Sequence, residues 1–289
     1  MSDATVQLPN SIELPSSGFI FGKTAAMSEV RRKIERAFLD DLPVLIEGES
    51  GTGKEVVGRY LHQHSMRREG PFTKLDCGAT SMRLLEEEIC GIREVAVSSG
   101  SKAESGCISQ ISRATLFLDQ IGDLDLPLQR TLIKALDQGN SERQTVPVAR
   151  RFICATRVDL ESPTKNQSFL RDLLACFAQH RVVLLPLRER KEDIPQICDY
   201  LLEKFARDLG RPVPKLSLYA LEAFQRWKWP GNIRELENWI ARIVLFGTEE
   251  AIGRDFDRLL LDGGAARPRR HRALHMKTEP LRRRWRQRT

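Results

Sequence analysis

The sequence has no run of about 18 consecutive apolar residues, which excludes a membrane-spanning helix from the predicted fold. Its first 17 residues are polar and lack the basic and apolar regions of a secretory signal. The six cysteines stand singly, and no two of them have the spacing of a zinc or redox motif. Isolated thiols are typical of a reducing compartment, so we expect a cytoplasmic protein in which most cysteines are small core residues.

The net charge of +7 is concentrated at one end of the chain. Residues 263–289 hold ten of the 46 Lys and Arg residues but only one of the 39 Asp and Glu residues. The remaining 262 residues, with 36 bases and 38 acids, are close to neutral. A basic segment of this kind predicts a disordered tail, with non-specific binding of nucleic acid or another polyanion as the functional alternative.

Short apolar segments that end in polar or turn residues alternate with helical patterns over the first two thirds of the chain. The helical patterns cover 54–64 and 127–137. The predicted strands are 43–48, 71–76, 115–119, 151–156 and 181–186. This alternation predicts an α/β fold with a mainly parallel sheet covered on both faces.

Beyond residue 193 the strand patterns stop, and three amphipathic helices are predicted at 194–209, 217–227 and 232–246. The apolar stripe of the third helix comprises Ile233, Leu236, Ile240, Ile243 and Val244. We therefore divide the 289 residues into four parts: a short N-terminal segment (1–18), an α/β nucleotide-binding subdomain (19–190), a helical lid subdomain (191–250) and a basic tail (251–289).

A glycine-rich turn connects the first predicted strand to the helix that follows it. Such a turn directs backbone N–H groups toward phosphate oxygens, and the N-terminus of the helix adds a positive field. Lys54 is predicted to contact the β- and γ-phosphates, whereas Glu55 stands where the general motif has a Ser or Thr that holds Mg²⁺. A glycine turn without a ligand is the alternative. The predicted phosphate-binding residues are Gly48, Glu49, Ser50, Gly51, Thr52, Gly53, Lys54 and Glu55.

The third predicted strand, 115–119, ends in Asp119. In proteins with a phosphate-binding loop, an Asp at this place lies beside the loop and holds Mg²⁺. A strand that ends in Asp is common by itself, but together with the preceding loop it predicts a nucleotide and Mg²⁺ site.

Four motifs, GESGTGKE, TLFLDQIGDL, LPLRERKEDI and WPGNIRELEN, occur in this order along the chain. They resemble the AAA+ domain of bacterial enhancer-binding proteins, the activators that remodel sigma-54 RNA polymerase. The resemblance extends from about Gly18 to about Phe246. It implies a parallel sheet of five strands, a helical lid, and a ring of subunits with ATP at each interface.

The same resemblance assigns further site residues. It implies that residues 19–27, with Gly22 among them, line the adenine pocket. It also implies that Arg234 in the lid reaches the bound phosphates, while a surface cation on a helix is the alternative for this residue.

The loop that contacts sigma-54 in the family reads G-A-F-T-G-A, and this chain departs from that pattern. The aromatic residue and the Thr are missing, although the length of the loop is kept. The residues in its place are Val95, Ala96, Val97, Ser98, Ser99 and Gly100.

The residues that carry hydrolysis in the family also differ. The acidic pair Asp-Glu is Asp119-Gln120 here, and the neutral amide cannot accept a proton from the attacking water. Asp76 replaces the Asn that switches the Glu, and Arg157 replaces the sensor Asn. The two arginines offered across the subunit interface align with Leu170 and Cys176, although a slip of one residue would let Arg171 serve as one of them.

These departures favour an ATP-binding transcription regulator with little or no hydrolysis. The alternatives are a slow ATPase that remodels sigma-54 RNA polymerase, a relic that binds no nucleotide, and a basic nucleic-acid-binding protein with the fold as scaffold. We expect self-association into a ring or assembly with a related AAA+ protein. We also expect contact with RNA polymerase or another transcription component, and no association with a membrane.

The tail is too short and polar for a helix-turn-helix, and we expect no N-terminal receiver domain.

Overall fold

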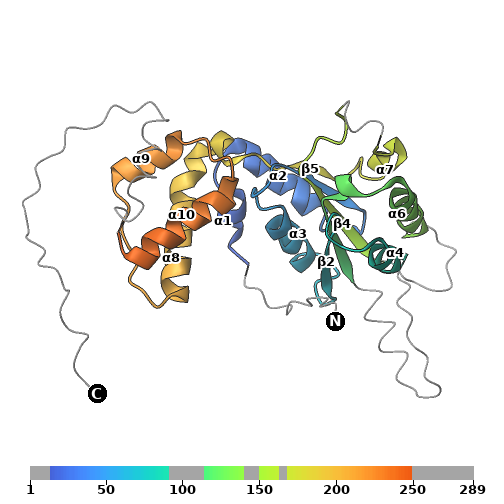
Figure 1. Cartoon of the computed structure of the whole chain (residues 1–289), viewed down its shortest axis with the longest axis horizontal. Coiled ribbons are helices and arrows are strands. Elements are labelled where there is room, and N and C mark those ends of the chain that lie inside the picture. Colours follow the sequence, from blue (N-terminus) through green and yellow to red (C-terminus); the bar gives the residue numbers. More distant parts are fainter. Residues whose placement is uncertain (1–13, 91–113, 140–149, 163–167, 249–289) are drawn as a thin grey trace, which may run out of the picture.

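The computed structural model describes residues 14–90, 114–139, 150–162 and 168–248. Five parallel strands form one sheet in the order β2-β3-β4-β1-β5 (Figure 1). Their bounds are β1 Val44–Glu47, β2 Phe72–Asp76, β3 Thr115–Asp119, β4 Arg151–Thr156 and β5 Arg181–Val183. The predicted α/β fold with a parallel sheet is therefore confirmed, and all five strand positions are as predicted, although β5 ends three residues early.

Helices cover both faces of the sheet because successive residues of a buried strand point to opposite sides. In β1, Val44 and Ile46 face one apolar cluster while Leu45 faces the other. The first cluster lies under α2 (Ala25–Arg36) and α3 (Lys54–Gln63). The second lies under α4 (Met82–Cys90), α6 (Leu126–Gly139) and α7 (Arg171–Ala175).

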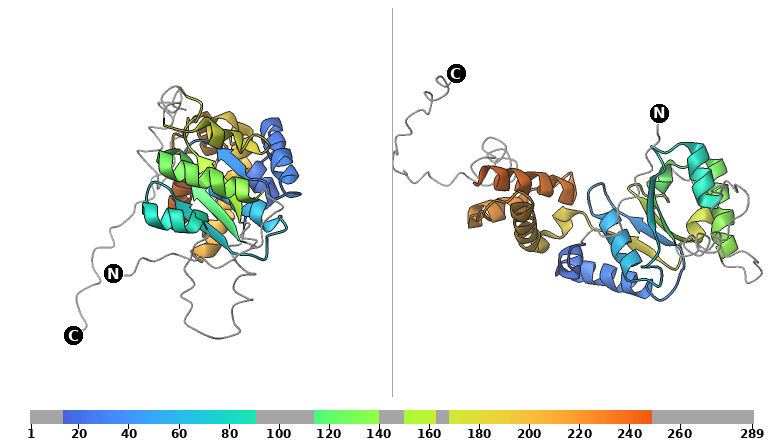
Figure 2. Two further views of the ribbon diagram at one scale, coloured as in Figure 1. Left: turned by 90° about the vertical axis from the view of Figure 1, so that its right-hand side faces the viewer. Right: turned by 90° about the horizontal axis from the view of Figure 1, so that it is seen from below.

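Three helices form the lid beside the sheet: α8 (Ile194–Asp208), α9 (Leu218–Arg226) and α10 (Asn232–Phe246). Figure 2 shows them gathered at one end of the molecule, away from α4 and α6. α10 packs along α8, and the fully buried Trp229 donates from its indole Nε1 to the Phe224 carbonyl at 2.7 Å. The lid shares its apolar cluster with α2, α3 and one sheet face, so lid and sheet are joined by a continuous core.

A buried ion pair fixes the start of the lid to the N-terminal segment. Asp193 and Arg190 are 2.9 Å apart and almost fully buried, and Asp193 also accepts the backbone N–H of Lys23 at 2.7 Å. Gly22, just after α1 (Ser17–Phe21), has φ +64°, and a Cβ there would come within 2.2 Å of the Asp193 carboxylate. Only glycine fits this approach, so Gly22 serves the packing of the lid against the N-terminal segment.

The predicted helix bounds agree with the structure to within one or two residues, and α10 matches its prediction at both ends. The predicted apolar stripe of α10 is wrong at one position, because Ile233 is only half-buried and lines a cavity. That cavity lies beside the predicted phosphate-binding residues 48–55, which we call the phosphate loop. Of the five described cysteines, Cys77, Cys154 and Cys198 are buried, as expected for core residues. None of the helices in the described ranges is long and apolar enough to cross a membrane.

Candidate functional site

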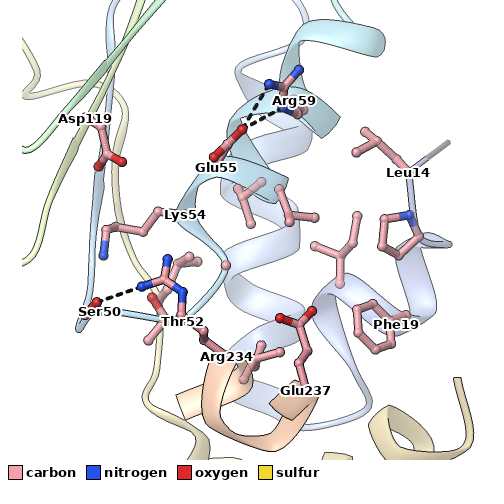
Figure 3. A pocket seen from close by; sticks show the side chains of 18 of the residues that line it. Leu14, Phe19, Ser50, Thr52, Lys54, Glu55, Arg59, Asp119, Arg234 and Glu237 are labelled. Atoms are coloured by element: carbon pink, nitrogen blue, oxygen red, sulfur yellow. Dashed lines mark hydrogen bonds and ion pairs between the residues drawn. The ribbon is translucent and has the colours of Figure 1, made fainter. Parts of the chain in front are cut away.

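A cavity of about 600 Å³ opens between the sheet and the lid. The carboxyl ends of β1, β3 and β4 supply one side, and α1, α8 and α10 supply the other. One end of the cavity is lined by charged side chains and the other by apolar ones, as Figure 3 shows for the residues that it labels. This position is where open parallel α/β sheets bind their ligands.

The loop between β1 and α3 passes directly under the lid. Gly51 has φ +79°, and a Cβ there would be 2.3 Å from the carbonyl oxygen of Gly231. Since no side chain fits that space, glycine lets the loop approach the backbone before α10 closely. The Ile233 N–H donates to the Gly51 carbonyl at 3.0 Å, which closes the contact.

Lys54, the first residue of α3, points into the loop that precedes it (Figure 3). Its ammonium donates to the carbonyl oxygens of Gly48 at 2.6 Å and Glu49 at 2.8 Å. Burial lowers the pKa of Lys54 to about 8, Asp119 opposes the shift, and Arg234 and Arg157 add to it. Nearby cations thus disfavour the charged lysine, and an anion placed among these groups would favour it.

Two acidic side chains at the polar end, Glu55 and Asp119, are already paired with cations. Lys74 of β2 lies between two carboxylates, 2.6 Å from Glu55 and 3.5 Å from Asp119. Glu55 also forms an ion pair with Arg59 one turn along α3. No group of three or more metal-ligating side chains occurs among the described residues, so any cation here would need ligand oxygens from elsewhere.

Gln120 adopts a left-handed backbone conformation, with φ +60°, at the point where β3 ends. Its side-chain amide donates to Asp76 at 3.1 Å. Both residues line the cavity next to Asp119. The pair therefore presents to the cavity an amide that is held by a carboxylate.

Asn232 connects the lid to the phosphate loop. Its amide nitrogen donates to the Ser50 carbonyl at 2.9 Å and to Glu49 at 3.1 Å, and its oxygen accepts the Leu187 N–H at 2.8 Å. Arg188 holds the same Glu49 through two bonds of 2.6 and 2.8 Å, and this contact lowers the pKa of Glu49 to about 2. We call these contacts around Asn232 and Glu49 the lid latch.

The other end of the cavity is apolar. Phe19 and Ile20 of α1 and Met27 of α2 contribute from the segment that was predicted to line it. The Phe19 ring packs against Tyr200 of α8 with a centroid distance of 4.0 Å. Glu237, one turn after Arg234 on α10, also lines this region, and burial raises the pKa of its carboxyl. An aromatic ligand with a polar edge fits such a compartment.

Most of the predicted site residues meet in this cavity. Arg234 lines it and donates to the Ser50 hydroxyl at 3.3 Å. The others that line it are Ser50, Gly51, Thr52, Gly53, Lys54, Glu55, Asp119 and Gln120.

Four predicted residues do not line this cavity. Gly22 packs against Asp193 and does not line the cavity. The prediction that Gly22 lines the adenine pocket is therefore wrong. Gly48 and Glu49 act instead through their carbonyl oxygens on Lys54, and Glu49 also through the lid latch. Arg171 lies at the start of α7 and lines a separate hollow with Arg181. The predicted partner loop, 95–100, lies outside the described residues.

Sequence reasoning missed Tyr200, Lys204 and Glu237 on the lid, and Lys74 and Arg59 on the sheet side. Only Glu237 had a pattern that could have revealed it, since it lies one helical turn after Arg234. Tyr200 and Lys204 belong to an amphipathic helix in which nothing local marks a ligand.

Comparisons with known proteins agree with this arrangement. Residues 20–182 match the family model described as the Sigma-54 interaction domain, and residues 188–269 match the AAA+ ATPase lid domain. The chain is 36% identical over 235 residues to the regulatory protein AtoC of Escherichia coli, covering 80% of this chain and 51% of AtoC. It is also 36% identical over 240 residues to the transcriptional regulator NtrC of Azospirillum brasilense, covering 82% and 50%.

Among solved structures, NtrX from Brucella abortus in complex with ATP superposes with a TM-score of 0.67 at 27% identity. The superposition covers 81% of this chain and 56% of NtrX. The chain thus spans about half the length of the curated relatives and of the solved structure that it matches.

The lid latch generates a prediction about stability. Asn232→Ala removes a fully buried amide and leaves the Leu187 N–H and the Ser50 carbonyl without their partner. We expect the free energy of unfolding to fall by about 1–3 kcal/mol, measured by urea denaturation. The control is Asn238→Ala, at an exposed position on the same helix. An equal loss of unfolding free energy in the two variants would contradict the stabilising role of the lid latch.

Proposed function

The chain belongs to the family of sigma-54 interaction domains with an AAA+ lid, and from this premise we propose that it is a cytoplasmic transcription regulator that binds ATP and hydrolyses it slowly or not at all. The observation that carries the proposal is the cavity itself. It combines a phosphate loop around Lys54 with an apolar compartment at Phe19 and Tyr200, and Gln120 at its edge offers an amide, which cannot act as a base.

Binding of ATP is supported by the chemistry of the two ends of the cavity. The N-terminus of α3 and Lys54 provide donors and positive charge for the phosphates, and Arg234 approaches from the lid. The aromatic pair of Phe19 and Tyr200 suits a purine base. The relative NtrX, whose solved complexes hold ATP and ADP, has the same fold.

The residues of the polar end also fit Mg²⁺. Asp119 and Glu55 line the cavity next to Lys54, and Mg²⁺ is usually held by one or two carboxylates together with phosphate oxygens. When bound, Mg²⁺ would offset the charge of the phosphates. Lys74 lies between the two carboxylates, and part of its ion pairing with them would then have to be lost.

Slow hydrolysis is proposed because the groups that would activate water are replaced. A neutral amide cannot take the proton of an attacking water, and Gln120 is moreover engaged as a donor to Asp76. Within this chain, Arg171 lines a different hollow, so it could act on ATP only from a neighbouring subunit. A slow ATPase that remodels sigma-54 RNA polymerase remains the second candidate, favoured by the overall similarity to AtoC and NtrC.

The proposed partners follow from the family and from the charge pattern. We propose self-association into a ring, or assembly with a related AAA+ protein, and contact with RNA polymerase or another transcription component. The basic segment 251–289 would add non-specific, salt-sensitive affinity for nucleic acid. The segment 95–100 lacks the aromatic anchor of the family loop, so the regulator would act without remodelling sigma-54 polymerase.

One prediction about nucleotide binding concerns Lys54. Lys54→Ala should weaken ATP binding at least about tenfold, because charge-assisted bonds to phosphate are lost. Isothermal titration calorimetry with Mg²⁺ measures the affinity, and Lys33→Ala on the exposed face of α2 is the control. Equal ATP affinities for the wild type and Lys54→Ala would contradict the proposal that this loop binds phosphate.

The same residue predicts a pH dependence. The pKa of Lys54 is about 8 without ligand, and bound phosphates would raise it. Binding above pH 8 therefore takes up a proton, and the affinity for ATP should fall as the pH rises through 8. An affinity that stays constant from pH 7 to 9 would contradict this role.

Another prediction concerns ATP turnover. Gln120→Glu alone would place two carboxylates side by side, because Asp76 is 3.1 Å from the amide that is replaced. We therefore expect Gln120→Glu with Asp76→Asn to raise ATP turnover more than either single change, by about 10²-fold if Arg171 acts in trans. Phosphate release assays measure the rates, and a wild-type turnover of about 1 s⁻¹ or faster would refute slow hydrolysis.

The last prediction about function concerns sigma-54. Burying an aromatic ring in a partner contributes roughly 1.5–3 kcal/mol, and Val95–Gly100 has no such ring. We expect no stable complex with sigma-54 in the presence of an ATP transition-state mimic, and no open complex at a sigma-54 promoter. Co-elution with sigma-54 that needs the mimic and is abolished by deleting residues 95–100 would overturn this expectation.

A further inference from the structure

Glu237 lies on α10 at the boundary between the polar and the apolar end of the cavity. It follows Arg234 by one helical turn, about 4.5 Å along the axis, so the two side chains project from the same face of the helix. In the view of Figure 3 the Glu237 carboxylate points into the cavity, between Arg234 on one side and the Phe19 ring on the other. The cavity therefore presents the phosphate loop, a carboxylate and an aromatic wall in succession.

The carboxylate of Glu237 has no donor from the protein around it. It makes no hydrogen bond or ion pair with any residue in the described ranges. The side chain is half-buried, and burial raises the pKa of its carboxyl, although the charges of Lys204 and Arg234 oppose the rise. Lys204 follows Tyr200 by one turn of α8, and its ammonium lies over the Phe205 ring, 5.7 Å from the centroid. A half-buried carboxylate in this position is available to hydrogen-bond donors of a ligand.

The chemistry of the carboxylate limits which part of a nucleotide it can face. Phosphate is excluded because two anions repel each other, and Lys54 and Arg234 already offer cations for the phosphates. The flat faces of a base suit the Phe19 ring. The sugar lies between the phosphates and the base, and a ribose carries two hydroxyl donors that the two oxygens of a carboxylate can accept. Dinucleotide-binding folds hold a ribose hydroxyl with an acidic side chain in the same way.

We propose that Glu237 accepts hydrogen bonds from the 2′- and 3′-hydroxyls of the ribose and makes the cavity selective for ribonucleotides over deoxyribonucleotides. The inference rests on the proposed function, namely that the cavity holds a nucleotide. It gives the sugar a binding residue that lies outside the phosphate loop, on the opposite side of the cavity.

The place of Glu237 in the fold gives this contact a second consequence. Glu237 belongs to the lid, whereas the phosphate loop belongs to the sheet subdomain. A ribonucleotide bound at both points would connect the two parts of the molecule through its phosphates and its sugar. A deoxyribonucleotide offers fewer hydroxyl donors to the lid, so it would bind more weakly even though its phosphates are the same.

The test compares the affinities of the full chain for ADP, 2′-deoxy-ADP and 2′,3′-dideoxy-ADP, which carry no terminal phosphate to hydrolyse. Isothermal titration calorimetry at fixed salt and Mg²⁺ is applied to the wild type, Glu237→Gln and Glu237→Leu. We expect the wild type to bind the dideoxy nucleotide at least about tenfold more weakly than ADP, with 2′-deoxy-ADP between them. In Glu237→Leu this ratio should fall below about twofold, and Glu237→Gln, which keeps one neutral acceptor, should give an intermediate ratio.

Two features of the experiment guard against a merely structural effect. The ratio of two affinities in one variant does not depend on the fraction of the protein that is folded. Glu203→Gln, at an exposed position of α8 that does not line the cavity, removes the same charge and should keep the wild-type ratio. The same ratio in the wild type and Glu237→Leu would overturn the inference, as would a wild type that binds ADP and its dideoxy analogue equally well.

The remaining outcomes separate this inference from the proposed function. Purine riboside diphosphate lacks the amino group of adenine. If Glu237→Leu changes the preference for ADP over this analogue but not over the dideoxy analogue, the carboxylate faces the base and the sugar assignment is wrong. If the wild type binds ADP without regard to its sugar and Lys54→Ala weakens that binding, only this inference fails. If the wild type binds no nucleotide, the proposed function and this inference fall together.

Discussion

The carboxamide of Asn232 holds the lid against the phosphate loop, and the geometry of the cavity depends on this contact. One fully buried side chain bonds Ser50 and Glu49 in the loop and the backbone of Leu187 before the lid. Its backbone has φ +53°, a conformation that Asn tolerates better than most residues. Because α10 starts here, Asn232 also sets where Arg234 and Glu237 enter the cavity.

The balance of charge explains how a site can favour binding over reaction. At the polar end, Lys54, Arg157 and Arg234 face the space between sheet and lid, while Asp119 and Glu55 are shared by Lys74. Such a site attracts polyanions. The step that would follow, transfer of a proton from water, finds the amide of Gln120 held by Asp76. In the proposed function, strong attraction and weak activation would therefore be properties of the same few side chains.

Much of the fold could be predicted because its information is local. The five strands are short apolar segments that end in turn residues, and α10 is bounded by Trp-Pro-Gly and by Gly247. Four helices were not predicted. In α1 and α7, five residues are too few to show a helical period, whereas α2 and α4 are longer and were missed as well. The site was predicted where one motif contains it, from Ser50 to Glu55, but Tyr200 and Lys204 have no such motif.

The sequence by itself determined the phosphate loop, the acid at the end of β3, the parallel sheet and the family to which the chain belongs. These features follow from residue types at fixed short spacings. The tertiary structure alone decided that Gly22 packs against Asp193, that Ile233 faces the cavity, and that Arg157 lines the same cavity as Lys54. The physical reason is that such contacts join segments far apart in the chain, for example Lys23 and Asp193, which are 170 residues apart, and their distance in space is set by the packing of the sheet and lid.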